Sequence, residues 1–146
     1  ISNEGKKFYF LVKKKNGSYE IHENDMPGIC KAPKYNIVKY SSNVRIIGME
    51  LSPNDKFLLL TFGTNFFKVL DIENEKIIHE VASDKGSVVT GATWSKDGKS
   101  IYWIRSDPYN NISKVNFDGM KELTTSEVIV NDFVGYFISL KPEEAA

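Results

Sequence analysis

Cysteine, histidine and long apolar runs are scarce in this sequence of 146 residues. The one cysteine, Cys30, excludes an internal disulfide and favours a reducing compartment. Two histidines, His22 and His79, are too few for a histidine-rich metal site. No apolar run approaches the roughly 18 residues that a membrane-spanning helix needs. We therefore expect a cytoplasmic protein with no metal and no membrane contact, and secretion is the alternative because Asn16-Gly17-Ser18 and Asn111-Ile112-Ser113 match the glycosylation acceptor pattern.

An excess of charge is also absent, because nineteen basic and nineteen acidic side chains cancel. The whole protein therefore has no long-range field that would attract nucleic acid, and such a partner would need a local basic patch. Apolar residues at 41% and charged residues at 26% are ordinary globular values. The length fits a single domain, residues 1–146.

What the sequence does have is an internal repeat. Leu51-Ser52-Pro53-Asn54-Asp55-Lys56 precedes an apolar run, and so do Trp94-Ser95-Lys96-Asp97-Gly98-Lys99 and Ile1-Ser2-Asn3-Glu4-Gly5-Lys6. A fourth start lies at Ile138, so that the starts near 1, 51, 94 and 138 are 50, 43 and 44 residues apart. A period of roughly 40–50 residues is typical of blades of four strands.

Short apolar runs separated by turn residues predict strands rather than helices. The first repeat lacks its opening strand, its turn-rich residues 24–40 are expected to form a loop, and Asn16-Gly17 predicts a type I′ turn. Residues 132–138 would open a fourth repeat. The expected strands of the two complete repeats are 44–51, 57–62, 66–72 and 76–81, then 88–94, 100–105, 111–116 and 121–124.

The predicted fold is all-β, with four-stranded antiparallel blades that form part of a β-propeller and about three blades in this chain. Propellers have four to eight blades. We therefore expect the chain to belong to a larger ring, completed by further blades or by another copy. A sequence that opens within a repeat and without a methionine also suggests a processed or truncated product.

The repeated motif at residues 51–56 and 94–99 resembles β-propeller repeats of the TolB and WD type. The chain is similar to the non-catalytic propellers of prolyl-oligopeptidase-type serine peptidases, in which the propeller filters peptides for a separate hydrolase domain. It also resembles the amino-terminal propeller of eukaryotic translation initiation factor 2A. Residues 101–107 with 114–119 resemble, more distantly, the repeats of lipoprotein-receptor propellers. These resemblances imply a blade architecture, which many functions share.

No catalytic or cofactor-binding constellation stands out. The Gly-x-Ser-x-Gly turn of a serine hydrolase is missing, and Gly86-Ser87-Val88-Val89-Thr90-Gly91 has the wrong spacing. The ten glycines are scattered, so no phosphate-binding loop is present. Most aspartates fall in expected turns, where they would cap backbone amides. The two histidines occupy similar places in their repeats, so that alternation on an outer strand would account for both. We expect a protein that is not an enzyme and binds no cofactor.

Candidate binding residues are basic or aromatic. Lys13, Lys14 and Lys15 form the basic run; they could meet phosphates, or simply form a solvated hairpin tip. Trp103 would face either the core or the central channel, whereas Trp94 fits a core position. Tyr109 lies in the loop of residues 106–111, which breaks the repeat pattern, as do the loops 13–18 and 24–39.

The sequence thus predicts a non-enzymatic scaffold that binds a protein or ribonucleoprotein partner through blade-end loops. The alternative is the substrate-gating propeller of a prolyl-oligopeptidase-type serine peptidase whose catalytic domain is not in this chain. A third possibility, the initiation-factor propeller, implies contact with the small ribosomal subunit through the lysine run.

Overall fold

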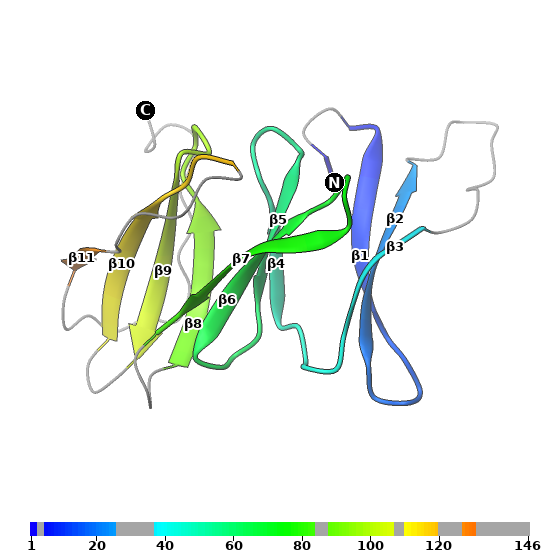
Figure 1. Cartoon of the computed structure of the whole chain (residues 1–146), viewed down its shortest axis with the longest axis horizontal. Coiled ribbons are helices and arrows are strands. Elements are labelled where there is room, and N and C mark those ends of the chain that lie inside the picture. The colour runs from blue at the N-terminus through cyan, green and yellow to red at the C-terminus, as the bar shows by residue number, and fades with distance from the viewer. Residues whose placement is uncertain (3–4, 26–36, 84–87, 107–109, 120–126, 131–146) are drawn as a thin grey trace.

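The computed structural model describes residues 1–2, 5–25, 37–83, 88–106, 110–119 and 127–130. Within these ranges the chain forms antiparallel strands and turns, with no helix and hence no helix that could span a membrane. Figure 1 shows three sheets side by side along the long axis of the molecule. The fold is therefore all-β, and the sheets are the blades of a partial β-propeller.

Blade 1 has the strand order β1-β2-β3, and blades 2 and 3 have the orders β4-β5-β6-β7 and β11-β10-β9-β8. The strands are β1 (Lys7–Lys13), β2 (Tyr19–Asp25), β3 (Ile37–Ser42), β4 (Gly48–Leu51), β5 (Phe57–Thr61), β6 (Phe66–Asp71), β7 (Lys76–Ala82), β8 (Val88–Trp94), β9 (Ser100–Ser106), β10 (Asn110–Asn116) and β11 (Glu127–Val130).

A serine explains the repeated motif. The hydroxyl of Ser52 accepts a hydrogen bond from the backbone N–H of Phe57, five residues later, at 3.0 Å, and the Ser52 N–H donates to the Phe57 carbonyl at 2.8 Å. Ser2 and Ser95 make the same pair of bonds to the fifth residue after each. Each turn also has one residue with positive φ, which two of the three repeats supply as glycine. These residues are Gly5, Asp55 and Gly98.

Two hydrophobic clusters hold the blades together, one at each junction. The cluster between blades 2 and 3 includes Phe57, Trp94, Trp103 and Phe117. The cluster between blades 1 and 2 is mainly aliphatic and consists of Ile21, Ile46, Leu58, Leu60, Phe62, Leu70 and Ile72. The core therefore lies between the sheets, as it must in blades that pack face to face.

Several sequence predictions need correction in the region of blade 1. The loop expected at residues 24–40 is wrong at both ends: residues 24–25 belong to β2 and residues 37–40 to β3, which pairs with β2 and gives the blade its outer strand. The hairpin is not a type I′ turn: the Gly17 N–H donates to the Lys14 carbonyl at 3.0 Å, and only Gly17 has positive φ there. An Asn16 side chain that accepts from the Ser18 N–H at 3.0 Å favours this wider loop.

The expected strands that correspond to β5 to β10 are confirmed within one residue at each end, whereas the strands at the ends of the repeats differ. The opening strand of the second repeat is only β4, residues 48–51, rather than 44–51. The outer strand of blade 3 is β11; the expected strand at 121–124 and the expected opening strand at 132–138 lie outside the described residues. The two histidines are not equivalent, because His79 is on the outer strand β7 whereas His22 is on the central strand β2.

Candidate functional site

The junction between blades 2 and 3 is filled by aromatic rings near the β4–β5 turn. Phe117 packs edge-on against Phe57 and Trp94, with ring centroids 5.1 and 4.9 Å apart. The Trp94 indole N–H donates to the Glu50 carbonyl at 3.0 Å, which ties blade 3 to β4 of blade 2. Only about 210 Å³ of cavity remains beside these rings.

Strand register identifies the equivalent residues at the junction between blades 1 and 2. Lys7 corresponds to Phe57, because each is the fifth residue after the motif serine and pairs with the last residue of the next strand. Leu51 corresponds to Trp94, since each directly precedes the serine. Ile72 corresponds to Phe117, since Ile72 directly follows the last residue of β6 and Phe117 directly follows the last residue of β10. A lysine and two aliphatic residues thus replace three aromatic rings.

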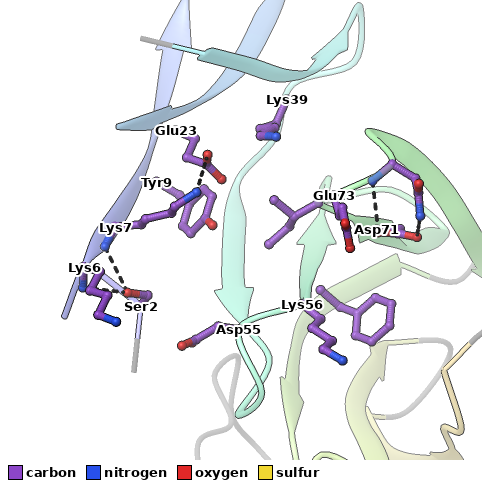
Figure 2. Close-up of a pocket in the computed structure, with 13 residues that line it drawn as sticks. Ser2, Lys6, Lys7, Tyr9, Glu23, Lys39, Asp55, Lys56, Asp71 and Glu73 are labelled. Atoms are coloured by element: carbon purple, nitrogen blue, oxygen red, sulfur yellow. Dashed lines mark hydrogen bonds and ion pairs between the residues drawn. The ribbon is translucent and has the colours of Figure 1, made fainter. Parts of the chain in front are cut away.

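A cavity of about 550 Å³ lies between blades 1 and 2, with Lys7 and Ile72 in its wall (Figure 2). This volume is within the range of small-molecule and side-chain binding pockets. Four lysines and four carboxylates are among its lining residues, so that the charges of the wall balance. The lining consists of Ser2, Lys6, Lys7, Tyr9, Glu23, Lys39, Asp55, Lys56, Phe57, Asp71, Ile72, Glu73 and Asn74.

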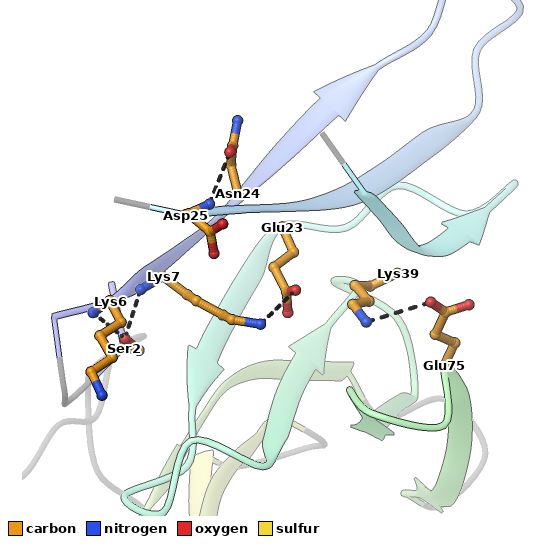
Figure 3. Close-up of polar contacts among 8 residues, drawn as sticks. All are labelled: Ser2, Lys6, Lys7, Glu23, Asn24, Asp25, Lys39 and Glu75. Carbon is orange, nitrogen blue, oxygen red and sulfur yellow. Dashed lines mark hydrogen bonds and ion pairs between the residues drawn. The ribbon is translucent and has the colours of Figure 1, made fainter. Parts of the chain in front are cut away.

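Glu23 is the most buried charged side chain of this cavity, followed by Asp71. Glu23 lies on β2 directly opposite Tyr9 of β1, and Lys7 is two residues before Tyr9, so that all three side chains point to the same face. Glu23 is 4% exposed, and its Oε1 lies 3.1 Å from the Lys7 Nζ (Figure 3). The Lys7 side chain, in contrast, is 47% exposed. A buried carboxylate is therefore paired with a cation that remains in contact with water.

Tyr9 stands beside this ion pair. Burial raises the pKa of the Tyr9 hydroxyl well above its usual value, and a hydrogen bond to Glu23 and the negative charges of Glu23 and Asp55 raise it further. The hydroxyl therefore stays protonated at all physiological pH values. It adds a hydrogen-bond donor and an aromatic ring to the cavity, but no charge.

Other charged side chains of the wall have partners of their own. The Lys39 Nζ lies 3.4 Å from Glu75 Oε1, outside the cavity lining (Figure 3). Asp71 accepts hydrogen bonds from the side-chain amide of Asn74 at 2.7 Å and from its backbone N–H at 3.3 Å. Asp71 thus caps the β6–β7 turn, as the sequence predicted for aspartates in turns, and Asp97 caps the next repeat by accepting from the Lys99 N–H at 2.9 Å.

The predicted binding residues do not gather at this cavity. Lys13, Lys14 and Lys15 are exposed in the β1–β2 hairpin, at the opposite end of the blades from the β4–β5 turn that borders the cavity (Figure 1). Lys14 Nζ lies 3.5 Å from Glu20 Oε1. Trp103 is 2% exposed and packs on Phe67, so the alternative of a channel-facing or binding Trp103 does not fit the described structure. Tyr109 lies outside the described residues.

Sequence reasoning missed the residues of the cavity. Lys7 and Glu23 carry no motif, and their polarity is unusual only when their positions are compared with Phe57 and Val69 of the next blade. That comparison needs the strand register. Among the described residues no group of three or more histidine, cysteine or acidic side chains is arranged as a metal site.

Comparison with solved structures supports the architecture. The chain is similar to the β-propeller domain of the trilobed protease from Pyrococcus furiosus, with 17% identity, a TM-score of 0.59, and coverage of 91% of this chain and 42% of that one. It is also similar to a 6-phosphogluconolactonase-like protein from Bacteroides uniformis, with 15% identity, a TM-score of 0.59, and coverage of 94% and 46%. A chain of the mitotic checkpoint complex matches with 19% identity, a TM-score of 0.54, and coverage of 92% and 43%.

At these identities the likenesses show the fold alone. The chain spans less than half the length of each of these three proteins. No protein-family model matches the sequence, and no curated protein matches it. The chain is thus a β-propeller segment of about three blades.

Proposed function

We propose that this chain is part of a non-enzymatic β-propeller that binds a protein partner at the blade ends. The observation that carries the proposal is the open cavity between blades 1 and 2, which is bordered by Ser2, Lys6 and Lys7 and by residues 55–57 and 71–74. The equivalent space between blades 2 and 3 is filled by the chain's own aromatic rings. A gap of this size at a blade end, lined by charges of both signs, suits a side chain or short segment of another protein.

A photo-crosslinking amino acid tests the proposal when it replaces Lys56, at the cavity rim, in the full-length parent protein. The matched control is Lys99, which occupies the same position of the next repeat and does not line the cavity. We expect one discrete adduct from position 56 that position 99 does not give, with the cross-linked segment identified by mass spectrometry. Identical adducts from both positions, or none from either, would refute binding at the cavity.

A ribonucleoprotein partner is the second form of this proposal, and the exposed lysines of the β1–β2 hairpin favour it. Changing Lys13, Lys14 and Lys15 to Glu should weaken co-sedimentation with small ribosomal subunits and reduce its salt dependence. Changing Lys76, Lys96 and Lys99 to Glu alters the charge equally at the other end of the blades, outside the cavity lining, and serves as the control. Unchanged binding of the hairpin variant would remove these lysines from the proposal.

The alternative is a substrate-gating propeller of a serine peptidase, and the similarity to the propeller of the trilobed protease supports it at the level of the fold. This alternative requires a hydrolase domain elsewhere in the parent protein. The parent reading frame decides between the two: a Gly-x-Ser-x-Gly turn followed by Asp and His would favour gating. Further blades without such a domain would favour the binding scaffold.

Additional blades, or a second copy of the chain, would cover the other face of blade 1. Phe8 and Phe10 stack on that face with centroids 5.5 Å apart. They occupy the positions of Leu58 and Leu60, which in blade 2 pack against blade 1. Phe10→Glu should therefore abolish self-association of the isolated chain, measured by analytical ultracentrifugation, if a second copy is the occupant. A monomeric unmodified chain would point to further blades instead.

A further inference from the structure

The Lys7–Glu23 pair shows what the cavity between blades 1 and 2 is built to hold. A carboxylate that is 4% exposed is costly unless a cation or several hydrogen bonds compensate its charge. Here an ammonium group provides that compensation, with 3.1 Å between Nζ and Oε1. Because the Lys7 side chain is 47% exposed, it can leave Glu23 and return to water with little loss of burial.

The surroundings of Glu23 suit a cation on an apolar stem. Tyr9, directly across the strand pair from Glu23, offers the face of a half-buried ring, and Ile72 and Phe57 supply apolar wall. A planar cation favours stacking on an aromatic ring and paired hydrogen bonds to a carboxylate. The protonated Tyr9 hydroxyl donates a hydrogen bond to Glu23, so that the Tyr9 ring and the Glu23 carboxylate lie side by side.

Two of the neighbouring charged side chains have partners of their own. Lys39 is directed to Glu75, and Asp71 is held by Asn74. The Lys7 ammonium lies 3.1 Å from Glu23, so a cationic ligand must displace it to reach the carboxylate. Lys7 thus occupies the place that the cation of a ligand would take.

We infer that the cavity receives an arginine side chain from a partner protein, whose guanidinium replaces the Lys7 ammonium at Glu23 and stacks on Tyr9. The inference rests on the proposed function, because it names the chemistry by which the cavity recognises the partner. A partner carboxylate paired with Lys7 is the opposite arrangement. It would leave Glu23 buried without its cation.

The test uses the purified chain and three blocked tripeptides, acetyl-Gly-Arg-Gly-amide and its Glu and Gln counterparts, in NMR titrations. Only the Arg peptide should bind saturably and shift the amide signals of Tyr9 and Glu23. Glu23→Gln keeps the shape of the side chain and should weaken this binding by about tenfold or more, as loss of a desolvated charge partner does. Glu80→Gln, at an exposed position of β7 outside the cavity lining, should leave the affinity unchanged.

Lys7→Gln separates a binding role from a structural one. Removing the competing ammonium should strengthen binding of the Arg peptide, whereas a lysine that merely stabilises the junction would give no gain. Tyr9→Leu should weaken binding through loss of the stacking surface, and circular dichroism confirms that each variant is folded. Equal binding of the Arg and Gln peptides, or tighter binding of the Glu peptide, would overturn the inference.

The outcome is distinguishable from failure of the proposed function. An adduct specific to position 56 that persists in Glu23→Gln, together with no saturable binding of the Arg peptide, would reject the arginine inference and leave partner binding at the cavity intact. If position 56 gives no specific adduct even when Glu23 is unchanged, both the arginine inference and the proposed function are rejected.

Discussion

The two blade junctions have the same backbone turns, but different side chains occupy the space between the blades. Between blades 2 and 3, Phe57, Trp94 and Phe117 meet edge to face. Between blades 1 and 2, Lys7 stands at the position of Phe57, and the chain leaves a cavity of about 550 Å³. We call the junction between blades 2 and 3 the closed junction and the junction between blades 1 and 2 the open junction. Since the serine hydrogen bonds are the same in all three repeats, the difference arises from the side chains at these positions and not from the turn itself.

The difference teaches that blade packing and ligand binding compete for the same space. Aromatic rings of this size bury a large apolar area and stabilise a junction strongly. A junction without those rings is less stable, but it has space for a ligand. In this chain the loss is confined to the turn end, because Ile21, Leu58 and Leu70 still pack in the middle of the junction.

The largest expected effect comes from breaking the aromatic junction. Trp94→Ala removes a ring that is 3% exposed, its contact with Phe117 and the hydrogen bond to the Glu50 carbonyl. We expect it to lower the free energy of unfolding by about 3–5 kcal/mol, measured by urea denaturation. Leu51→Ala, the equivalent change at the open junction, should cost clearly less, because Leu51 is only partly buried. Equal losses would contradict the distinction between the junctions.

Most of the fold could be predicted because the repeat fixes it locally. A serine, a turn residue with positive φ and an apolar run recur at each start, and the strands that follow were expected within one or two residues. Blade 1 was predicted less well: β3 contains Lys39 and Ser41, and its apolar alternation is too weak to distinguish a strand from a loop. Only pairing with β2 reveals it.

The candidate site could not be predicted from the sequence, because it depends on register. A lysine and a glutamate sixteen residues apart have no recognisable spacing, and they meet only because β1 and β2 place them on one face. Basic and aromatic runs gave a stronger signal. They led to Lys13, Lys14 and Lys15 at the opposite end of the blades.

Converting the open junction into the closed one is the second test. Lys7→Phe alone leaves Glu23 buried without its cation and should lower the free energy of unfolding by about 1–3 kcal/mol. Adding Glu23→Val, the residue found at the equivalent position 69, removes that charge and should restore or exceed the original stability. The four unfolding curves form a double-mutant cycle. Purely additive effects would contradict coupling between Lys7 and Glu23.

The shared turn provides a third and smaller effect. Ser52→Ala removes the hydroxyl that accepts from the Phe57 N–H, at a residue that is 1% exposed, and should cost about 1–2 kcal/mol in unfolding free energy. Ser2→Ala removes the same bond at the edge of the open junction, where Ser2 is 8% exposed and water can replace the hydroxyl. We expect a smaller loss there. A larger loss for Ser2→Ala would show that the cavity shields this turn from water.

The smallest effect concerns pH and Glu50, which joins the closed junction by accepting hydrogen bonds from the Thr93 hydroxyl at 2.8 Å and the Trp94 N–H at 3.1 Å. Burial raises the pKa of the Glu50 carboxyl, and these hydrogen bonds partly offset the rise. Since the folded state then binds a proton more readily than the unfolded state, the contribution of Glu50 to stability is fully present below the unfolded pKa. It is lost as pH rises through the folded pKa.

Glu50→Gln should therefore flatten the dependence of unfolding free energy on pH above about 4, the ordinary range of a glutamate. Asp97→Asn is the matched control of opposite sign, because hydrogen bonds from the Ser95 hydroxyl and the Lys99 N–H lower the pKa of Asp97. That residue contributes stability above its unfolded pKa and loses it as pH falls. Urea denaturation at several pH values measures both. If the curves of Glu50→Gln and the unmodified chain run parallel, burial of Glu50 at the junction between blades 2 and 3 does not affect its protonation.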